Sequence, residues 1–431
     1  MNKITVKKSS GIIGEIKIPG DKSISHRSIM IGSISNGKTT VKNFLFSEDC
    51  LHTISCFKSL GADIKEKSVF LSKNRLIEIQ GNGLHGLREP DETLYVGNSG
   101  TTIRLICGIL SGQNFRSTIT GDVSITNRPM KRIIDPLRTM GANIRGEEDD
   151  AKAPLLIERG KIKPTTVEMQ VASAQVKSCV LLAGLYARGT TTIVEKIPTR
   201  DHMERMLEYF GAEIKKDGNK IYITGNPYLT GKPVDVPGDI SSAAFFMVGA
   251  SIIRNSDITM KNIGFNPTRS AIVDILNRMG AHIEVSNERT VSNEPRADIR
   301  VKSSTNLRAI NLSGAIIPQI IDEIPILVLA ATQAQGTSII KGALELRVKE
   351  SDRIASMALE LRKMGAKIEE LEDGLIIHGG TSLRGADCKS HSDHRVAMTL
   401  LIAGLIADGE TNVEGTEFIE TSFPGFEAIL K

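Results

Sequence analysis

The sequence contains no tryptophan and few aromatic residues of any kind. Tyrosine and phenylalanine number 5 and 12, so aromatic side chains make up 4% of the 431 residues. Proteins that bind single-stranded nucleic acid stack the bases on aromatic side chains, so this class is disfavoured. An excess of charge of one sign is also missing, because 54 Lys and Arg face 50 Asp and Glu and leave a net charge of +4. This charge indicates neither a nucleic-acid partner nor a membrane surface, so affinity for anions must come from where the cations are placed.

Cysteine is scarce, and long apolar runs are missing. The five cysteines never form a Cys-x-x-Cys pair and lie far apart, at Cys50, Cys56, Cys107, Cys179 and Cys388. This number and spacing predict neither a disulfide framework nor a thiolate metal site, and they fit a reducing cytoplasm. The best apolar stretch, Ala243 to Ile253, is too short to span a bilayer. We therefore expect a soluble cytoplasmic protein, with two or three well-packed domains in a chain of this length.

Two short patterns recur along the chain. In the first, an amphipathic run closes on Gly-Ala and continues into alternating residues, with the glycines at Gly61, Gly141, Gly211, Gly280 and Gly365. This pattern predicts a helix, a glycine that ends it, and a strand. In the second, an apolar helix runs through a small polar loop into a β-branched strand, at 25–41, 99–119, 174–193, 241–258, 322–339 and 392–413. Six units of this kind predict a repeat architecture.

A three-residue motif that occurs twice divides the six units into two sets. Pro19-Gly20-Asp21 is repeated as Pro237-Gly238-Asp239, an offset of 218 residues, which is about half the chain. We interpret both segments as crossings between two domains of three units each. The predicted domains are 21–237, and 1–20 plus 238–431.

Charged and small polar residues collect where the repeat helices are expected to begin. These places are 22–27, 98–102, 173–177, 322–323 and 393–395. Helix N-termini carry unpaired N–H groups and a partial positive charge, so several of them facing one cleft would bind anions. Ordinary capping explains the Ser, Asn and Asp but gives no reason for Lys or Arg at the positive end of a helix. The set therefore predicts an anion-binding cleft.

Three other motifs point less clearly to a function. Gly32 to Thr39 matches the P-loop pattern, but a helix is predicted before it and a strand after it, which is the reverse of a nucleotide site. His391 and His394 have Cys388 close by in the sequence but no further His or second Cys, so a metal site is disfavoured. The run from Lys349 to Arg353, taken alone, equally describes a solvated helix start.

Five motifs in order along the whole chain resemble the 5-enolpyruvylshikimate-3-phosphate (EPSP) synthase family. They lie at 18–27, 97–104, 128–130, 348–353 and 393–395. The resemblance implies an α/β fold, a two-domain inside-out α/β barrel in which each domain holds three βαβαββ repeats with pseudo-threefold symmetry. It also implies transfer of the enolpyruvyl group of phosphoenolpyruvate to the 5-hydroxyl of shikimate 3-phosphate through a tetrahedral intermediate, with release of phosphate. No cofactor or metal is implied, the partners are these two small molecules, and a monomer is expected.

The resemblance also assigns roles to individual residues. Domain 21–237 is expected to bind mainly shikimate 3-phosphate, and the other domain to carry the catalytic carboxylates. Lys22 is assigned to both substrates; Ser23, Arg27, Ser173, Gln175 and Lys349 to shikimate 3-phosphate; Gly100, Arg128, Arg353 and Arg395 to phosphoenolpyruvate; and Asn98 to substrate binding. Asp322 is the expected base for the hydroxyl proton, and Glu350, with Lys22 close by, moves the proton at the methylene carbon. Ala174 stands where many members have Ser, and Arg200 is the residue expected to restore that phosphate contact.

Two rival interpretations were weighed on the residues. UDP-N-acetylglucosamine enolpyruvyl transferase shares the fold and the donor, but it typically has a reactive Cys in a Gly-Cys-x-Ile-Gly loop, and no cysteine here has that setting. A non-catalytic anion- or RNA-binding protein would also use basic helix ends. The carboxylates Asp322 and Glu350 among the cations count against it, because a simple anion binder gains nothing from them.

Overall fold

The computed structural model describes residues 2–68 and 75–430, and the chain divides into two compact units. Unit 1 comprises Met1–Pro19, Pro237–Arg289 and Pro295–Lys431, and unit 2 comprises Gly20–Val236 and Thr290–Glu294. Each unit has its own continuous hydrophobic core. The short segment Thr290–Glu294 contains the turn between β16 (His282–Val291) and β17 (Glu294–Lys302).

Unit 2 is built from three βαβαββ repeats, each with one four-stranded sheet. The first contains β14 (Pro233–Asp235), α1 (Lys22–Ser33), β3 (Asn36–Lys42), α2 (Glu48–Ser59), β4 (Asp63–Ser68) and β5 (Arg75–Asn82). The second contains β6 (Leu94–Tyr95), α3 (Gly100–Leu110), β7 (Ser117–Thr120), α4 (Val123–Thr126), α5 (Lys131–Thr139), β8 (Asn143–Gly146), α6 (Glu147–Asp150) and β9 (Lys152–Glu158). The third contains β10 (Thr166–Glu168), α7 (Ala174–Gly184), β11 (Thr190–Val194), α8 (His202–Phe210), β12 (Ile214–Asp217) and β13 (Lys220–Thr224). In each sheet the first strand is parallel to the second, and the remaining pairs are antiparallel.

Unit 1 follows the same plan, except that the sheet of its third repeat has three strands. Its first repeat contains β2 (Ile13–Glu15), α9 (Ile240–Ile252), β15 (Asp257–Gly264), α10 (Ala271–Met279), β16 (His282–Val291) and β17 (Glu294–Lys302). The second contains β18 (Asn311–Leu312), α11 (Ile317–Ile320), α12 (Ile324–Gln333), β19 (Thr337–Ile340), α13 (Arg353–Lys363), β20 (Lys367–Leu371) and β21 (Gly374–His378). The third contains β22 (Asp387–Lys389), α14 (His394–Gly404), β23 (Glu410–Glu414), β1 (Lys3–Lys7) and α15 (Phe426–Leu430). Short 3-10 helices span Gly314–Ile316, Leu344–Val348 and Thr416–Thr421.

The five Gly-Ala segments end helices as predicted. Their glycines directly follow or lie one residue beyond α2, α5, α8, α10 and α13, and all have φ between 86° and 106°. Glycine adopts this left-handed conformation without the clash that a side chain would cause. The last repeat has no such segment because its antiparallel partner strand comes from the N-terminus, where β1 pairs with β23.

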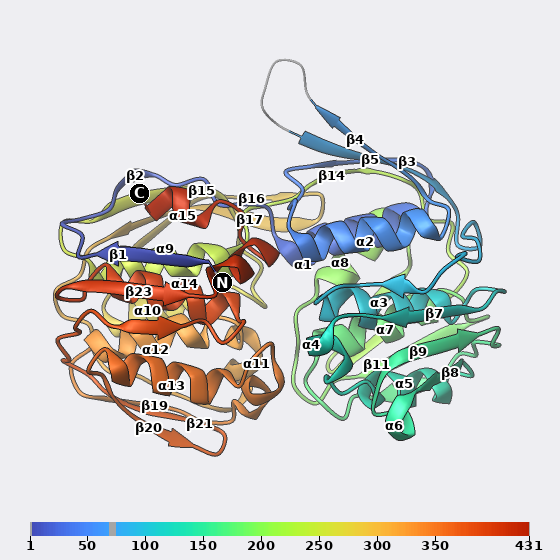
Figure 1. Ribbon diagram of the computed structural model, residues 1–431. Coiled ribbons are helices and arrows are strands. Elements are labelled where there is room, and N and C mark those ends of the chain that lie inside the picture. Colours follow the sequence, from blue (N-terminus) through green and yellow to red (C-terminus); the bar gives the residue numbers. More distant parts are fainter. Residues whose placement is uncertain (1, 69–74, 431) are drawn as a thin grey trace. The chain divides into compact units, whose positions relative to one another are not determined.

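The six apolar helices of the second pattern form the centre of each unit. They are α1, α3 and α7 in unit 2, and α9, α12 and α14 in unit 1. In unit 1 the three helices contact one another, and α9 and α14 lie behind β1 and β23 in the view of Figure 1. A helix that is apolar on all sides must be covered all round, so the sheets lie outside and the helices inside. This confirms the predicted inside-out repeats.

The P-loop pattern has the predicted reversed order of elements. Gly32 belongs to the end of α1, and Gly37 and Thr39 lie in β3, so the motif runs from a helix into a strand. Among residues 2–68 and 75–430, no single helix is long and apolar enough to cross a membrane. The bent pair Gly314–Ile320 and Ile324–Gln333 passes by length and composition alone.

Two helical glycines give a test of how closely the central helices pack. A Cβ on Gly108 in α3 would lie 2.2 Å from the carbonyl oxygen of Cys179 in α7, whereas a Cβ on Gly249 in α9 would meet its nearest atom, on Ile402, at 3.5 Å. We expect Gly108→Ala to lower the free energy of unfolding by about 1–3 kcal/mol through overpacking. Gly249→Ala is the control and should be neutral or stabilising by up to about 1 kcal/mol, because alanine favours a helix. Chemical denaturation measures both, and equal effects would contradict the close approach of α3 and α7.

Candidate active site

In unit 2 the N-terminal ends of α1, α3 and α7 lie together. Arg27 of α1 donates from Nη2 to Ser178 Oγ of α7 at 2.9 Å, and Gln175 of α7 donates from Nε2 to Thr101 Oγ1 of α3 at 3.1 Å. Asp21, Ser99 and Ser173 cap the three helices, each accepting a backbone N–H of the first turn. Three positive helix ends in one place attract anions.

Two cations of α1 are held by neighbouring groups. The Lys22 ammonium forms an ion pair with the Asp49 carboxylate at the start of α2. Arg27 donates from Nη1 to the carbonyl oxygen of Ser23 at 2.9 Å. Burial lowers the pKa of Arg27 to about 10, so it remains a cation at neutral pH. Asp49 was not singled out in the sequence, where it looks like an ordinary acidic residue in a first helical turn.

Arg128, Asn98 and Gly100 form one group at the start of α3. Arg128 donates from Nη2 to Asn98 Oδ1 at 2.7 Å and to Ser124 Oγ at 3.1 Å. A Cβ on Gly100 would lie 2.7 Å from Arg128 Nη1, so a side chain at this position would push the guanidinium away. Glycine thus lets the Arg128 guanidinium lie against the first turn of α3.

Arg104 contacts an expected site residue, although the sequence motifs assigned it no role. It donates from Nη1 to Gln175 Oε1 at 2.5 Å, while Gln175 Nε2 is bound to Thr101. Both amide atoms of Gln175 are therefore held by α3. The signal was available, because Arg104 lies four residues after Gly100 and so shares its helix face.

Lys177 and Arg200 are two cations of the third repeat of unit 2 that lie in different surroundings. The sequence analysis counted Lys177 among the cations that attract anions, but its side chain is 1% exposed and forms ion pairs with Glu195 at 3.2 Å and Glu204 at 2.6 Å. Its charge is offset inside the unit. Arg200, in the segment between β11 and α8, is half-buried, and its positive charge contributes to lowering the pKa of Arg27.

In unit 1 the guanidinium of Arg353 is surrounded by three carboxylates. Arg353 is 1% exposed and donates from Nε to Asp393 at 2.8 Å, from Nη2 to Glu350 at 2.5 Å, and from Nη1 to Asp322 at 3.4 Å. Burial alone would lower the pKa of Arg353, but Asp393, Glu350 and Asp322 together raise it above its ordinary value. Arg353 is a permanent cation that fixes two expected catalytic carboxylates in one place.

Two further expected residues join this group. Arg395 donates from Nη1 to the backbone oxygen of Asp322 at 2.9 Å, and its Nε lies 3.8 Å from Asp322 Oδ1. Burial lowers the pKa of Lys349, and the negative charge of Asp322 opposes that shift. The structure therefore brings Asp322, Lys349, Glu350, Arg353 and Arg395 together.

A second buried cluster forms around Glu323, the residue that follows Asp322 in the sequence. Glu323, which is 0% exposed, accepts a hydrogen bond from Ser241 Oγ at the start of α9, and Arg269 Nη2 lies 3.8 Å from Glu323 Oε1. Arg269 also donates to Ser241 Oγ. These contacts place the starts of α9 and α12 side by side, so the helix ends converge in unit 1 as they do in unit 2.

The turn before Asp393 is held in an unusual conformation. His391 and Ser392 have φ of 53° and 59°, in the left-handed region that costs a non-glycine residue about 1–2 kcal/mol. Buried Glu360 holds the turn, accepting from His391 Nε2 at 2.7 Å and from the backbone N–H of Lys389 at 3.1 Å. In the described ranges, no group of three His, Cys, Asp or Glu is arranged to hold a metal ion.

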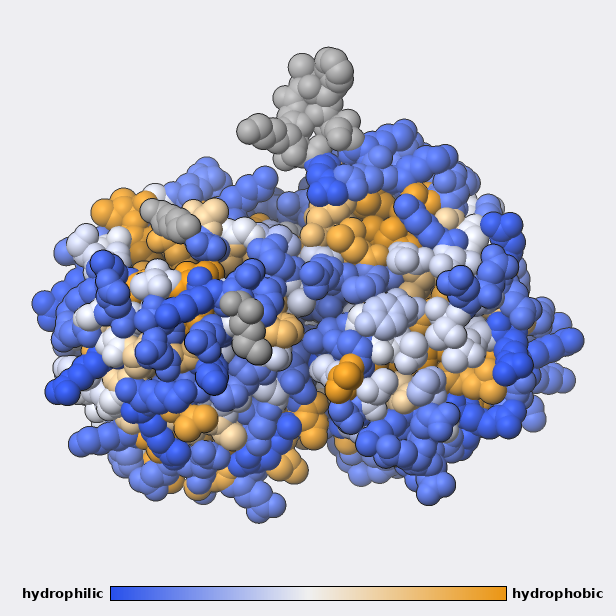
Figure 2. Space-filling model, viewed as in Figure 1, coloured by the Kyte–Doolittle hydropathy of each residue, from blue (hydrophilic) through white to orange (hydrophobic). Residues whose placement is uncertain are grey.

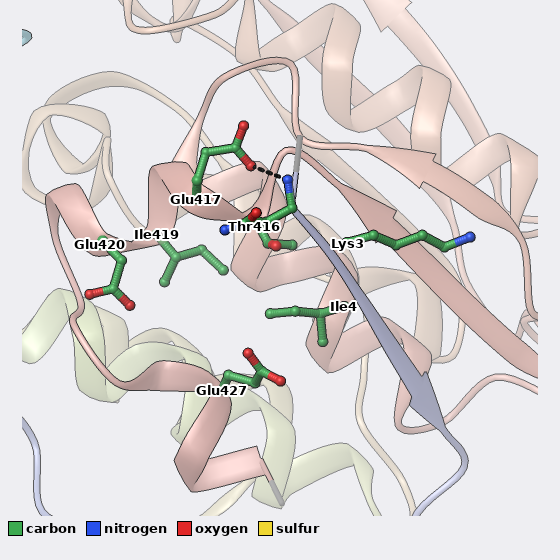
Figure 3. Close-up of a pocket in the computed structure, with 8 residues that line it drawn as sticks. Lys3, Ile4, Thr416, Glu417, Ile419, Glu420 and Glu427 are labelled. Carbon is green, nitrogen blue, oxygen red and sulfur yellow. Dashed lines mark hydrogen bonds between the residues drawn. The ribbon is translucent and has the colours of Figure 1, made fainter.

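A cavity of about 270 Å³ lies elsewhere in unit 1 (Figure 3). It is lined by Asn2, Lys3, Ile4, Thr416, Glu417, Ile419, Glu420 and Glu427. None of the expected site residues is among them. Three glutamates against one lysine would repel phosphorylated carboxylates, so this cavity does not suit the expected substrates.

Neutralising Asp393 tests how strongly Arg353 depends on it. Asp393 is 0% exposed, accepts from Arg353, and caps α14 by accepting the Arg395 N–H at 2.8 Å. We expect Asp393→Asn to lower the free energy of unfolding by about 2–4 kcal/mol, because a buried cation loses one of its counter-charges. Asp122→Asn, at the half-exposed cap of α4, is the matched control and should change stability by only a few tenths of a kcal/mol, since Asn caps about as well as Asp. Thermal unfolding compares them, and a harmless Asp393→Asn would show that the ion pair is dispensable.

The comparisons with known proteins agree with one another. The family model described as EPSP synthase (3-phosphoshikimate 1-carboxyvinyltransferase) matches residues 6–430. A 3-phosphoshikimate 1-carboxyvinyltransferase from Desulforamulus reducens is 51% identical over 418 residues, covering 97% of this chain and 96% of that protein. One from Pelotomaculum thermopropionicum is 50% identical over 425 residues, covering 99% and 97%. The solved structure of EPSP synthase from Acinetobacter baumannii is similar with a TM-score of 0.87 and 44% identity, covering 99% of this chain and 97% of that one.

Proposed function

This chain belongs to the EPSP synthase family, and from this premise we propose which of its residues carry out the reaction. The enzyme transfers the enolpyruvyl group of phosphoenolpyruvate to the 5-hydroxyl of shikimate 3-phosphate and releases phosphate, a step of aromatic amino acid biosynthesis. The observation that carries the residue assignment is the group of three carboxylates on Arg353. A reaction that both adds and removes protons needs carboxylates, and anionic substrates need cations beside them.

We propose that the cations divide between the two substrates. Shikimate 3-phosphate is bound by Lys22, Ser23, Arg27, Ser173, Gln175, Arg200 and Lys349, and phosphoenolpyruvate by Lys22, Asn98, Gly100, Arg128, Arg353 and Arg395. Guanidinium forks suit planar carboxylates and phosphates, because two parallel N–H groups meet two oxygens. Domain 21–237 then binds mainly shikimate 3-phosphate, and domain 1–20 plus 238–431 supplies the catalytic carboxylates. Lys22 and Arg27 at the start of α1, with the contact of Arg27 to Ser178 of α7, support the first role.

The two carboxylates have separate tasks in this proposal. Glu350 delivers a proton to the methylene carbon of phosphoenolpyruvate, and the 5-hydroxyl oxygen attacks the neighbouring carbon, which has become electron-poor. Asp322 accepts the hydroxyl proton, which gives the tetrahedral intermediate. Glu350 then takes back a proton from the new methyl group, the carbon–carbon double bond re-forms, and phosphate leaves. The contact of Arg353 with both carboxylates supports this pairing, because one cation sets their distance from each other.

We also propose that the enzyme is a cytoplasmic monomer. All five cysteines are free and buried, which suits a reducing compartment. The face in Figure 2 is mostly hydrophilic, with apolar residues in separate patches. A stable subunit interface usually needs a larger continuous apolar centre.

Replacing each carboxylate by its amide separates their tasks. We expect Glu350→Gln to keep substrate binding while kcat falls about 100-fold or more, the usual worth of a positioned acid–base group. Asp322→Asn should lower kcat similarly. In deuterated water, exchange of the methylene hydrogens of phosphoenolpyruvate requires protonation at carbon, so it should be lost more completely in Glu350→Gln than in Asp322→Asn.

The control for this experiment is Glu369→Gln. Glu369 is an exposed carboxylate of unit 1 that bonds His378, and its amide variant should keep the parental kcat and exchange rate. If Glu350→Gln turns over or exchanges hydrogens at the parental rate, Glu350 serves only to order the cations. Lys22 would then be the leading candidate for the proton carrier.

A further inference from the structure

The buried ammonium of Lys177 takes part in no step described above. Lys177 lies in α7, four residues after Ser173, and its side chain is 1% exposed. Its Nζ contacts Glu204 Oε1 at 2.6 Å, Glu195 Oε2 at 3.2 Å and the carbonyl oxygen of Thr199 at 3.2 Å. An ammonium has three N–H donors, so each one has an acceptor.

The three acceptors all lie in one stretch of ten residues, 195–204, which includes Arg200. Glu195 directly follows β11, Thr199 directly precedes Arg200, and Glu204 lies in the first turn of α8. Thr199 also donates its N–H and its hydroxyl to Glu195 Oε1, at 3.2 Å and 2.5 Å. Residues on both sides of Arg200 in the sequence are thus bound by the single ammonium of Lys177.

Burying the Lys177 ammonium together with two glutamates costs more free energy than filling the same volume with apolar side chains. An ammonium buried without partners is strongly unfavourable, and well-packed apolar side chains of similar volume often stabilise a protein as well as a buried ion pair does. Burial also raises the pKa of Glu204 despite its contact with Lys177, so the charged form of this carboxylate is disfavoured there. Stability alone therefore does not account for the cluster, whereas a requirement for a fixed position does.

Lys177 also joins this segment to the start of α7. Its backbone N–H donates to the carbonyl oxygen of Ser173 at 3.0 Å, while its ammonium holds the carbonyl oxygen of Thr199. The residue before Arg200 and the cap of α7 are therefore connected through one lysine. Ala174 has no hydroxyl to donate at the start of α7. The binding of an anion there therefore depends more strongly on the position of Arg200.

We propose that Lys177 is a positioning residue that sets Arg200 relative to Ser173 and Gln175, and through them the affinity for the phosphate group of shikimate 3-phosphate. This inference rests on the proposed contact of Arg200 with that phosphate. Lys177 itself does not touch the substrate. Its effect should therefore appear in the binding of shikimate 3-phosphate and disappear when Arg200 is absent.

A double-mutant cycle tests this dependence. KM for each substrate and kcat are measured for Lys177→Met, Arg200→Ala and the double variant. Arg200→Ala should raise KM for shikimate 3-phosphate about tenfold or more, the usual effect of losing a charge-assisted contact. Lys177→Met should raise the same KM about tenfold and leave KM for phosphoenolpyruvate and kcat within about twofold. The double variant should be no worse than Arg200→Ala, because coupled residues give non-additive effects.

Two further variants keep the test decisive if Lys177→Met is unstable. Lys177→Met combined with Glu204→Gln also removes a carboxylate that would otherwise lose its counter-charge, and it should show the same rise in KM. Leu182→Ala, in the same helix but against Gly108 of α3, is the control for lost stability and should leave KM for shikimate 3-phosphate unchanged.

The outcomes separate the two claims. An unchanged KM for shikimate 3-phosphate in Arg200→Ala would overturn the proposed phosphate contact and the inference with it. If Arg200→Ala weakens binding but the Lys177 variants do not, or if the two effects multiply in the double variant, the contact stands and the positioning role is wrong. A rise in both KM values for the Lys177 variants would also contradict the inference, since it would indicate general damage.

Discussion

The site depends on buried carboxylates that hold cations in place. Asp49 holds Lys22, Asp393 holds Arg353, and Glu195 with Glu204 holds Lys177. Two like charges about 4 Å apart repel by about 4 kcal/mol at the effective dielectric of a protein surface, while a whole domain is stable by only about 5–15 kcal/mol. Several cations cannot gather at positive helix ends without such counter-charges. The carboxylates offset the repulsion and fix long side chains that would otherwise sample many rotamers.

The repeat architecture explains why the cations gather at all. In each unit three apolar helices are enclosed by sheets, so they pack against one another and their N-terminal ends come together. Residues from three different repeats then share one site. In unit 2 this end is mainly cationic, and in unit 1 it combines cations with carboxylates. In the mechanism that we propose, the first binds anions and the second moves protons.

The sequence predicts the local parts of this structure well and the pairings poorly. The Gly-Ala segments and the six helix-to-strand units follow from periodicities of a few residues, and the helix starts at Lys22 and Arg353 follow from their motifs. The partners could not be predicted, because Asp49 lies in the next helix after Lys22 and Asp393 lies in another repeat than Arg353. Lys177 shows the limit most clearly. Its place near a helix start indicated an anion site, but periodicity says nothing of the glutamates that the next elements bring against it.

The pairing of strands that lie far apart in the sequence could not be predicted from local patterns either. β14 closes the first sheet of unit 2 from the far end of that unit, and β1 closes the last sheet of unit 1 from the N-terminus. Such contacts are decided by which sheet edge is left open once the repeats have formed, not by the residues of the strand itself.

The central claim is that the protein's own carboxylates hold the cations, and the Arg353 side chain reports on it directly. Nitrogen-15 NMR of arginine-labelled enzyme without substrates, with the signal assigned by its loss in Arg353→Lys, measures hydrogen exchange of the Nε–H that Arg353 donates to Asp393. The account predicts exchange at least about a hundredfold slower than in a free arginine side chain, a local opening free energy above about 2.7 kcal/mol. Exchange as fast as in free arginine, slowed only when shikimate 3-phosphate and phosphoenolpyruvate are added, would contradict it.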